Sequence, residues 1–443
     1  MAGLAAIVLA GCAHFTPLPL AQRPDLAGGV GQLSADVSQI RLAPLPARPI
    51  DPMRLTPTDA AILAVLNSPD LNAKRAATGV AAAQAFAAGL LPDPQLTPVS
   101  MDFPEHPKGL VPAWNLTPTI DIVALITRGA AHEAAEQAER QANLDLLWSE
   151  WSTAQKARQL ALTALMDEAK AKVLAAIDTD LAERARQSGL ASERHDVTAA
   201  IAGADLAAKL DADVQLRDTE RAAVTARAQL NAVIGLDPSV RLPLVDEAGP
   251  HDPTASAIST ALADLSRRRP DLLALQAGYA SQNANLRKAI LAQFPVLNLG
   301  YSRQRDTGAI LTNGWTANID IPIFNGNRGN IAIERATRAK LAQEYQARID
   351  QTAAEVDQAR RDLADELAEQ RRLETQVPIL EQQARSARPA LARGDLDSAA
   401  YLAIEESALK EVATLWDTRL ARRVADIGLE TVLFTPPPEV SAR

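Results

Sequence analysis

An internal repeat is the feature that most restricts how this chain of 443 residues can fold. Ser68-Pro69-Asp70-Leu71 returns as Arg269-Pro270-Asp271-Leu272, an offset of 201 positions (269 − 68). The other matches, in the same order, are Pro94 with Pro295, Trp114 with Trp315, Ile120-Asp121-Ile122 with Ile319-Asp320-Ile321, Arg128-Gly129 with Arg328-Gly329, and Ile234-Gly235-Leu236 with Ile427-Gly428-Leu429. Isolated dipeptides match by chance, but so many in one order do not. We therefore expect one structural unit used twice.

Each half shows the same predicted order of elements. An alanine-rich helix comes first, over about residues 58–90 and 258–292, and two short β-patterned segments follow it. A very long helical stretch comes next, and in the first half it contains no proline between Pro118 and Pro238. A helix of about 60 residues is roughly 90 Å long, far beyond the usual length in a globular protein.

The long stretches are expected to fold back as helical hairpins, with their turns at Gly189 and Gly394. The second stretch has apolar residues at alternating steps of four and three, which is coiled-coil spacing. These residues are Leu373, Val377, Leu380, Ala384, Ala387 and Leu391. Pro378 and Pro389 lie within this stripe, so kinks or a break are expected there.

The β-patterned segments alternate apolar and polar residues, as a strand with two different faces does. From Trp315 to Ile323 every second residue is apolar, and the first half repeats the pattern around Ile120. This alternation suits transmembrane strands with an apolar outside and a polar lumen, but it equally suits half-buried strands of a soluble sheet. Under the first interpretation the lumen-facing residues are Thr117, Thr119, Asp121, Asn298, Thr316, Asn318 and Asp320.

Four strands cannot close a barrel. An open sheet edge cannot face hydrocarbon, because its N–H and C=O groups would be unpaired there. The transmembrane interpretation therefore requires several protomers to contribute strands to one shared barrel.

The N-terminus has the features of a bacterial lipoprotein signal. A short apolar run over residues 3–10 leads to Gly11 and then to Cys12, the only cysteine of the chain. In such signals the cysteine becomes the acylated first residue, and Cys12 is the expected lipid attachment site. An ordinary secretory cleavage with an incidental thiol is the alternative.

These features divide the chain into six parts. They are a signal at 1–12, a Pro/Gly-rich strap at 13–54, a first repeat at 55–236, a linker at 237–254, a second repeat at 255–434 and a tail at 435–443.

Composition and motifs argue against several functions. The net charge is −9, so no nucleic-acid partner is suggested. A single cysteine excludes a disulfide framework and a thiolate metal cluster. His132-Glu133-Ala134-Ala135-Glu136 lacks the second histidine of the zinc-protease motif, and the sequence has no phosphate-binding loop or nucleophile elbow. We therefore expect no enzymatic activity, no cofactor and no metal site.

Taken in order within a repeat, the motifs resemble those of the TolC-like outer-membrane efflux proteins, in particular their lipidated branch. The resemblance covers about residues 55–434. It rests on Asn67-Ser68-Pro69-Asp70-Leu71, Arg269-Pro270-Asp271-Leu272, Phe294-Pro295-Val296-Leu297, Ile321-Pro322-Ile323-Phe324-Asn325-Gly326 and the tip-like Gly189-Leu190-Ala191 with Asp196-Val197.

The resemblance implies a homotrimer in outer-membrane lipid. Four strands per protomer would complete a twelve-stranded barrel set on a long α-helical barrel, so the fold class is mainly α with a small β part. Such proteins are passive exit ducts that dock a periplasmic adaptor and an inner-membrane transporter. The family's acidic pore motif is not conserved here, since its positions hold Ala400 and Ala403. Expected tip, gate and adaptor-contact residues are Gly189, Leu190, Asp196, Gly394, Asp395, Asp397, Glu405 and Glu406.

The sequence therefore predicts a lipid-anchored outer-membrane channel of a tripartite efflux or secretion system, with a long periplasmic part. The alternative is a periplasmic coiled-coil lipoprotein or adaptor with a structural role and no pore. That alternative would share the helices and Cys12, but it has no use for the four alternating strands.

Overall fold

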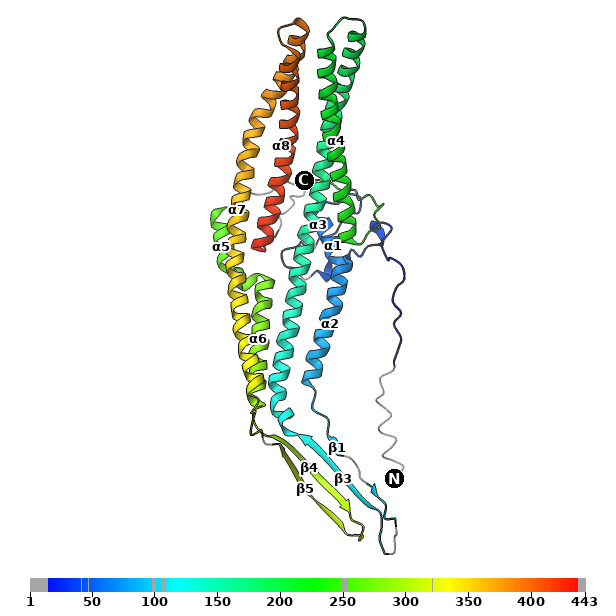
Figure 1. Cartoon of the computed structure of the whole chain (residues 1–443), viewed down its shortest axis with the longest axis vertical. Coiled ribbons are helices and arrows are strands. Elements are labelled where there is room, and N and C mark those ends of the chain that lie inside the picture. Colours follow the sequence, from blue (N-terminus) through cyan, green and yellow to red (C-terminus); the bar gives the residue numbers. More distant parts are fainter. Residues whose placement is uncertain are drawn as a thin grey trace.

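The computed structural model describes residues 15–436, except 41, 47, 98–100, 106–108, 248–253 and 321. The molecule is long and narrow, with a small sheet at one end and the turns of two helical hairpins at the other (Figure 1). Its mainly helical fold class with a small β part is confirmed. In chain order the elements are η1 (Val30–Gln32), η2 (Val37–Gln39), α1 (Pro57–Asn67), α2 (Pro69–Gly89), β1 (Gln95–Thr97), β2 (Met101–Asp102), β3 (Ala113–Asp121), α3 (Ile122–Glu193), α4 (Ala199–Ile234), α5 (Ala255–Arg268), α6 (Pro270–Leu291), β4 (Val296–Arg305), β5 (Leu311–Asp320), α7 (Arg328–Arg393) and α8 (Ser398–Leu433).

The first helix predicted for each half is in fact two helices. The helix expected over 58–90 is interrupted at Ser68, and the one over 258–292 at Arg269. Both residues precede a proline and have extended backbones, with ψ of 125° and 120°. The proline ring disfavours the helical conformation in the residue before it, and the proline then opens the next helix. The single-helix prediction was wrong at these two points.

Two very long helices form the hairpins with their shorter partners. α3 has 72 residues and α7 has 66. Gly394 ends α7 in a left-handed conformation with φ of 78°, as predicted. The turn expected at Gly189 was misplaced, because α3 continues through it to Glu193 and the left-handed residue is His195, with φ of 63°.

The predicted coiled-coil stripe packs α7 against α8. Five of its six residues are buried, and Leu380 is half-buried. Leu373 and Val377 contact Val412 and Leu415 of α8, in a cluster nearer the middle of the helix than the one formed by Ala387 and Leu391 with Tyr401. The break expected at Pro378 and Pro389 does not occur, and α7 continues through both. Both prolines are exposed, and the packing of the stripe on the other side of α7 offsets their missing backbone hydrogen bonds.

The sheet is antiparallel, in the order β1-β3-β4-β5, with β2 also paired to β3. β3 and β5 stop at Asp121 and Asp320, earlier than the alternation predicts. Asp121 ends its strand because its carboxylate accepts a hydrogen bond from the Ala124 amide, 3.0 Å away, and so caps α3. After β5, Pro322 has no amide to continue the strand ladder.

The core lies at mid-length, where both halves meet. Trp151 of α3 is fully buried and its ring meets Phe434 edge-on at 5.2 Å between centroids. Leu42 and Leu45 of the strap pack on the same cluster. The strap is therefore part of the folded structure at this level.

Arg269, in the repeated Pro-Asp-Leu motif, joins four helices at this level. It is only 1% exposed, and its guanidinium bonds the Asp271 carboxylate at 2.8 Å, the Glu355 carboxylate at 3.4 Å and the Val432 carbonyl at 3.1 Å. The same group lies 4.5 Å from the centre of the Trp148 ring. It thereby ties α6 to α3, α7 and α8.

We expect Arg269→Ala to lower the free energy of unfolding by about 3 kcal/mol, the lower end of what breaking a buried ion pair costs. The loss stays at that end because Arg348 still bonds both Asp271 and Glu355. Thermal or denaturant unfolding in detergent measures it. Arg268→Ala, at the exposed neighbouring position, is the control and should change stability little. Equal stability of the two variants would contradict this role.

Candidate functional site

The sheet has one polar face. Residues that pair directly across an antiparallel sheet share a face, and so do alternate residues along a strand. Asp121 pairs with Asn298 and Asn298 with Asn318, while Thr119 pairs with Gly300 and Gly300 with Thr316. All seven residues predicted to line a lumen therefore lie on this face, namely Thr117, Thr119, Asp121, Asn298, Thr316, Asn318 and Asp320.

The opposite face is mostly apolar, and no element of the described chain covers it. Trp315 is 85% exposed although it stacks edge-on with Tyr301, at 5.4 Å between ring centroids. This face carries Leu96, Met101, Trp114, Leu116, Ile120, Leu297, Leu299, Tyr301, Leu311, Trp315, Ala317 and Ile319. A large, mostly apolar surface of this kind marks contact with another protein or with lipid.

The tips of the hairpins carry the predicted acidic residues in ordinary surface roles. Asp196 pairs with Arg194 at 3.3 Å and Asp395 with Arg393 at 2.8 Å, both exposed. The Asp397 carboxylate accepts from the Ala400 amide at 2.7 Å and caps α8. Leu190 is exposed in the last turns of α3. These side chains do not converge on one point.

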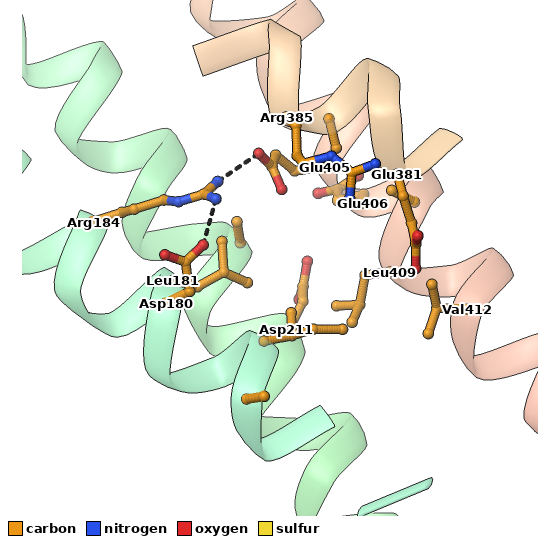
Figure 2. Close-up of a pocket in the computed structure, with 15 residues that line it drawn as sticks. Asp180, Leu181, Arg184, Asp211, Glu381, Arg385, Glu405, Glu406, Leu409 and Val412 are labelled. Carbon is orange, nitrogen blue, oxygen red and sulfur yellow. Dashed lines mark hydrogen bonds and ion pairs between the residues drawn. The ribbon is translucent and has the colours of Figure 1, made fainter. Parts of the chain in front are cut away.

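Glu405 and Glu406 lie further along α8, where they line a cavity of about 320 Å³ between the two hairpins (Figure 2). Asp180 and Arg184 of α3 enter it from the first hairpin, and Arg385 of α7 from the second. Five carboxylates and two guanidiniums line the cavity; the carboxylates are Asp180, Asp211, Glu381, Glu405 and Glu406. The cavity is therefore acidic.

One ion pair crosses this cavity from hairpin to hairpin. Nη1 of Arg184 donates to Oε1 of Glu405 at 2.7 Å, and the same guanidinium pairs with Asp180 one turn earlier on α3 (Figure 2). Burial raises the pKa of Glu405, and the charge of Arg184 opposes that rise. A partly buried carboxylate needs a cation beside it to stay charged at low cost, and Arg184 provides that cation for Glu405.

Tyr401 completes the link from α8. It is fully buried, and its hydroxyl is close to Arg184 and to Asp205 of α4 without hydrogen-bond geometry to any described residue. Burial, together with the charges of Glu405 and Asp205, raises the pKa of Tyr401, so the phenol keeps its proton. α3, α4 and α8 thus meet in one polar cluster.

Sequence reasoning found Glu405 but missed Asp180, Arg184, Asp205 and Tyr401. Arg184 and Glu405 are 221 positions apart, and no spacing rule links charges on separate helices. Comparing the two halves of the sequence does not reveal these contacts either, because the partners come from different hairpins.

Cys12, the expected lipid attachment site, lies outside the described residues. Within the described part of the chain, no group of three or more metal-binding side chains gathers. None of the described helices is long and apolar enough to cross a bilayer.

No protein-family model matches the chain, and no curated protein matches it. Solved structures do. CusC is 17% identical, with a TM-score of 0.73, 94% of this chain covered and 98% of that chain. The outer-membrane channel OprN is 15% identical, with a TM-score of 0.74 and the same coverage of both chains. The CmeC outer-membrane channel of Campylobacter jejuni is 14% identical, with a TM-score of 0.72 and 85% coverage of each. The resemblance seen in the sequence holds at the level of architecture: the chain has the fold of the TolC-like outer-membrane channels.

Proposed function

We propose that the protein is an outer-membrane exit duct of a tripartite efflux or secretion system. The two-faced sheet carries this proposal: one face supplies hydroxyl, amide and carboxylate groups suited to water, and the other is apolar and uncovered. In an outer membrane the apolar face contacts lipid and the polar face lines the lumen. A coiled-coil lipoprotein without a pore would not need such a sheet.

The proposal includes a homotrimer. β1 and β2 form one edge of the sheet and β5 forms the other, and neither edge is covered within the described chain. Backbone groups at those edges need partners in hydrocarbon, which strands from further copies supply. A row of exposed apolar residues on one side of α4, Leu206, Leu210 and Val214, would be covered by the same neighbours.

The helices make up the periplasmic part, since they leave the sheet on one side only (Figure 1). The hairpin tips at Leu190, Asp196 and Asp395 are the surfaces that we propose for a periplasmic adaptor, which would connect the duct to an inner-membrane transporter. The transporter would supply the energy, and the duct would conduct passively.

Purified protein in a planar bilayer should give discrete conductance steps with a preference for cations, because Asp121 and Asp320 lie on the polar face. Asp320→Asn should lower that preference, measured as a reversal-potential shift toward zero in a salt gradient. Asp25→Asn, an exposed change in the strap, is the matched control. A folded, helical protein that does not conduct, even after Arg184→Gln removes the pair with Glu405 between the hairpins, would exclude the duct and favour the structural alternative.

We further propose that the Arg184–Glu405 pair helps to hold the duct shut at its periplasmic end. It joins the two hairpins (Figure 2), two turns after the start of α8, where a separation of the hairpins would widen the passage. A hydrogen bond between charged groups contributes about 1.5–3 kcal/mol, which corresponds to a roughly tenfold or larger change in a closed-to-open ratio.

Arg184→Gln should therefore raise the open fraction in single-channel records by roughly tenfold, limited by full opening. Arg186→Gln is the matched control, because Arg186 is exposed on the same helix and, among the described residues, forms its ion pair with Glu183 of its own helix. If Arg184→Gln and Arg186→Gln gate like the wild type, the pair does not hold the gate.

We also propose acylation of Cys12. The described residues that follow it run from the helices toward the sheet end of the molecule, which would bring a lipid to the membrane (Figure 1). Mass spectrometry of protein made in a bacterium should find Cys12 as the acylated N-terminal residue, and Cys12→Ala should lack the acyl mass. A free thiol at Cys12 in mature protein would rule out the anchor.

A further inference from the structure

Two arginines interrupt the apolar face of the sheet. Arg303 pairs with Leu116 and Asn313, and Arg305 pairs with Trp114 and Leu311, so both side chains share the face of Tyr301 and Trp315. They belong to β4, whose two neighbours, β3 and β5, come from the same chain. A strand from another copy therefore cannot cover them edge to edge.

Both arginines lie at the end of β4 that is far from the helices. β4 starts after α6 and runs away from it, so Arg305 is at the outer tip (Figure 1). Nine residue steps separate Val296, the first residue of β4, from Arg305, the last (305 − 296), or about 30 Å of strand. A tilt of about 40° reduces this to about 23 Å, close to the ~25 Å apolar band of a membrane sheet.

Aromatic side chains surround the pair, as they do at the boundary between hydrocarbon and headgroups. Trp114 lies opposite Arg305, and Tyr301 and Trp315 stack one step nearer the membrane centre. The Tyr301 hydroxyl accepts a hydrogen bond from Nδ2 of Asn313 at 3.0 Å, so polar groups accompany the aromatic rings at this position along the strands. An arginine on a lipid-facing surface is costly at the midplane but close to neutral at such a boundary.

The positive charge here is not neutralised by acidic side chains of the described chain. Arg303 makes no ion pair with a described residue, and Arg305 donates to the Pro112 carbonyl at 3.1 and 2.8 Å from Nε and Nη2. The nearby Asp306 instead accepts from the Gly308 and Ile310 amides, both at 2.9 Å, within its own turn. A guanidinium pair at this depth is complementary to phosphate.

We propose that Arg303 and Arg305 form a binding site for anionic phospholipid headgroups, which carry phosphate without a compensating cation, in the leaflet farthest from the helices. This rests on the proposed membrane duct and adds a lipid partner to it. The bound lipid fixes how deep the sheet sits, since the guanidiniums hold its headgroups while the apolar rows below contact the acyl chains.

The test uses quenching of tryptophan fluorescence in bilayers of the full-length protein. Brominated phosphatidylglycerol and brominated phosphatidylcholine are compared, because bromine on the acyl chains quenches Trp114 and Trp315 only when that lipid is adjacent. The wild type should prefer phosphatidylglycerol, and Arg303→Gln with Arg305→Gln should weaken the preference by about tenfold or more. Higher salt should weaken it as well.

Two further variants keep the result interpretable. Arg303→Lys with Arg305→Lys keeps the charge and should retain most of the preference. Arg267→Gln with Arg268→Gln removes the same charge from the exposed surface of α5 and should retain all of it. Free inorganic phosphate at the same concentration should not compete, because the site includes acyl-chain contacts.

Each outcome has one meaning. Equal quenching of the wild type by both lipids overturns the lipid site but leaves the duct intact, since the sheet is then in the bilayer. A preference that survives in the Arg303/Arg305 variant, or that is lost equally in the α5 control, also overturns the site. No quenching by either lipid shows that the sheet is outside the bilayer, and the proposed function fails with it.

Discussion

The sheet depends on partners for its two open edges, and most of what we propose follows from that need. Within the described chain, β3 and β4 are hydrogen-bonded on both sides, whereas β1, β2 and β5 are paired on one side. In water the edges would be a site of aggregation, and in hydrocarbon they would be untenable. The proposed closure by copies of the same chain would meet the need without a second protein. It would also bring neighbouring hairpins together and cover the exposed row at Leu206, Leu210 and Val214.

Periodicity explains which parts of this fold could be predicted from the sequence. The stripe from Leu373 to Leu391 and the two faces of the strands follow from spacing within one element, and both were found. The interruptions at Ser68 and Arg269 could also have been foreseen, because each precedes a proline. Gly189 was misleading because a glycine is tolerated inside a helix whose other side is packed, and the turn fell at His195 instead.

The polar contacts between hairpins could not be predicted in the same way. Arg184 meets Glu405 and Tyr401 only because two helices, far apart in sequence, lie side by side. The same holds for Arg269, which reaches Glu355 of α7 and Val432 of α8 within its own half, and Trp148 of the other half. The spacing of residues within one helix does not indicate which residues of another helix will contact Arg184 or Arg269.

The contacts of Arg269 and of Arg184 differ in how easily water can replace them. Arg269 is enclosed by Trp148 and by backbone as well as by carboxylates, so separating it would expose several groups at once. Arg184 faces an acidic cavity, and its partners Asp180 and Glu405 can each be solvated when the hairpins move apart. A buried ion pair adds little net stability compared with apolar packing, but it strongly favours one arrangement. The polar link lies beside Ala384 and Arg385, within the span of the Leu373–Leu391 stripe that packs α7 against α8. In the proposed gate the two hairpins would therefore move apart while the stripe keeps the second hairpin packed.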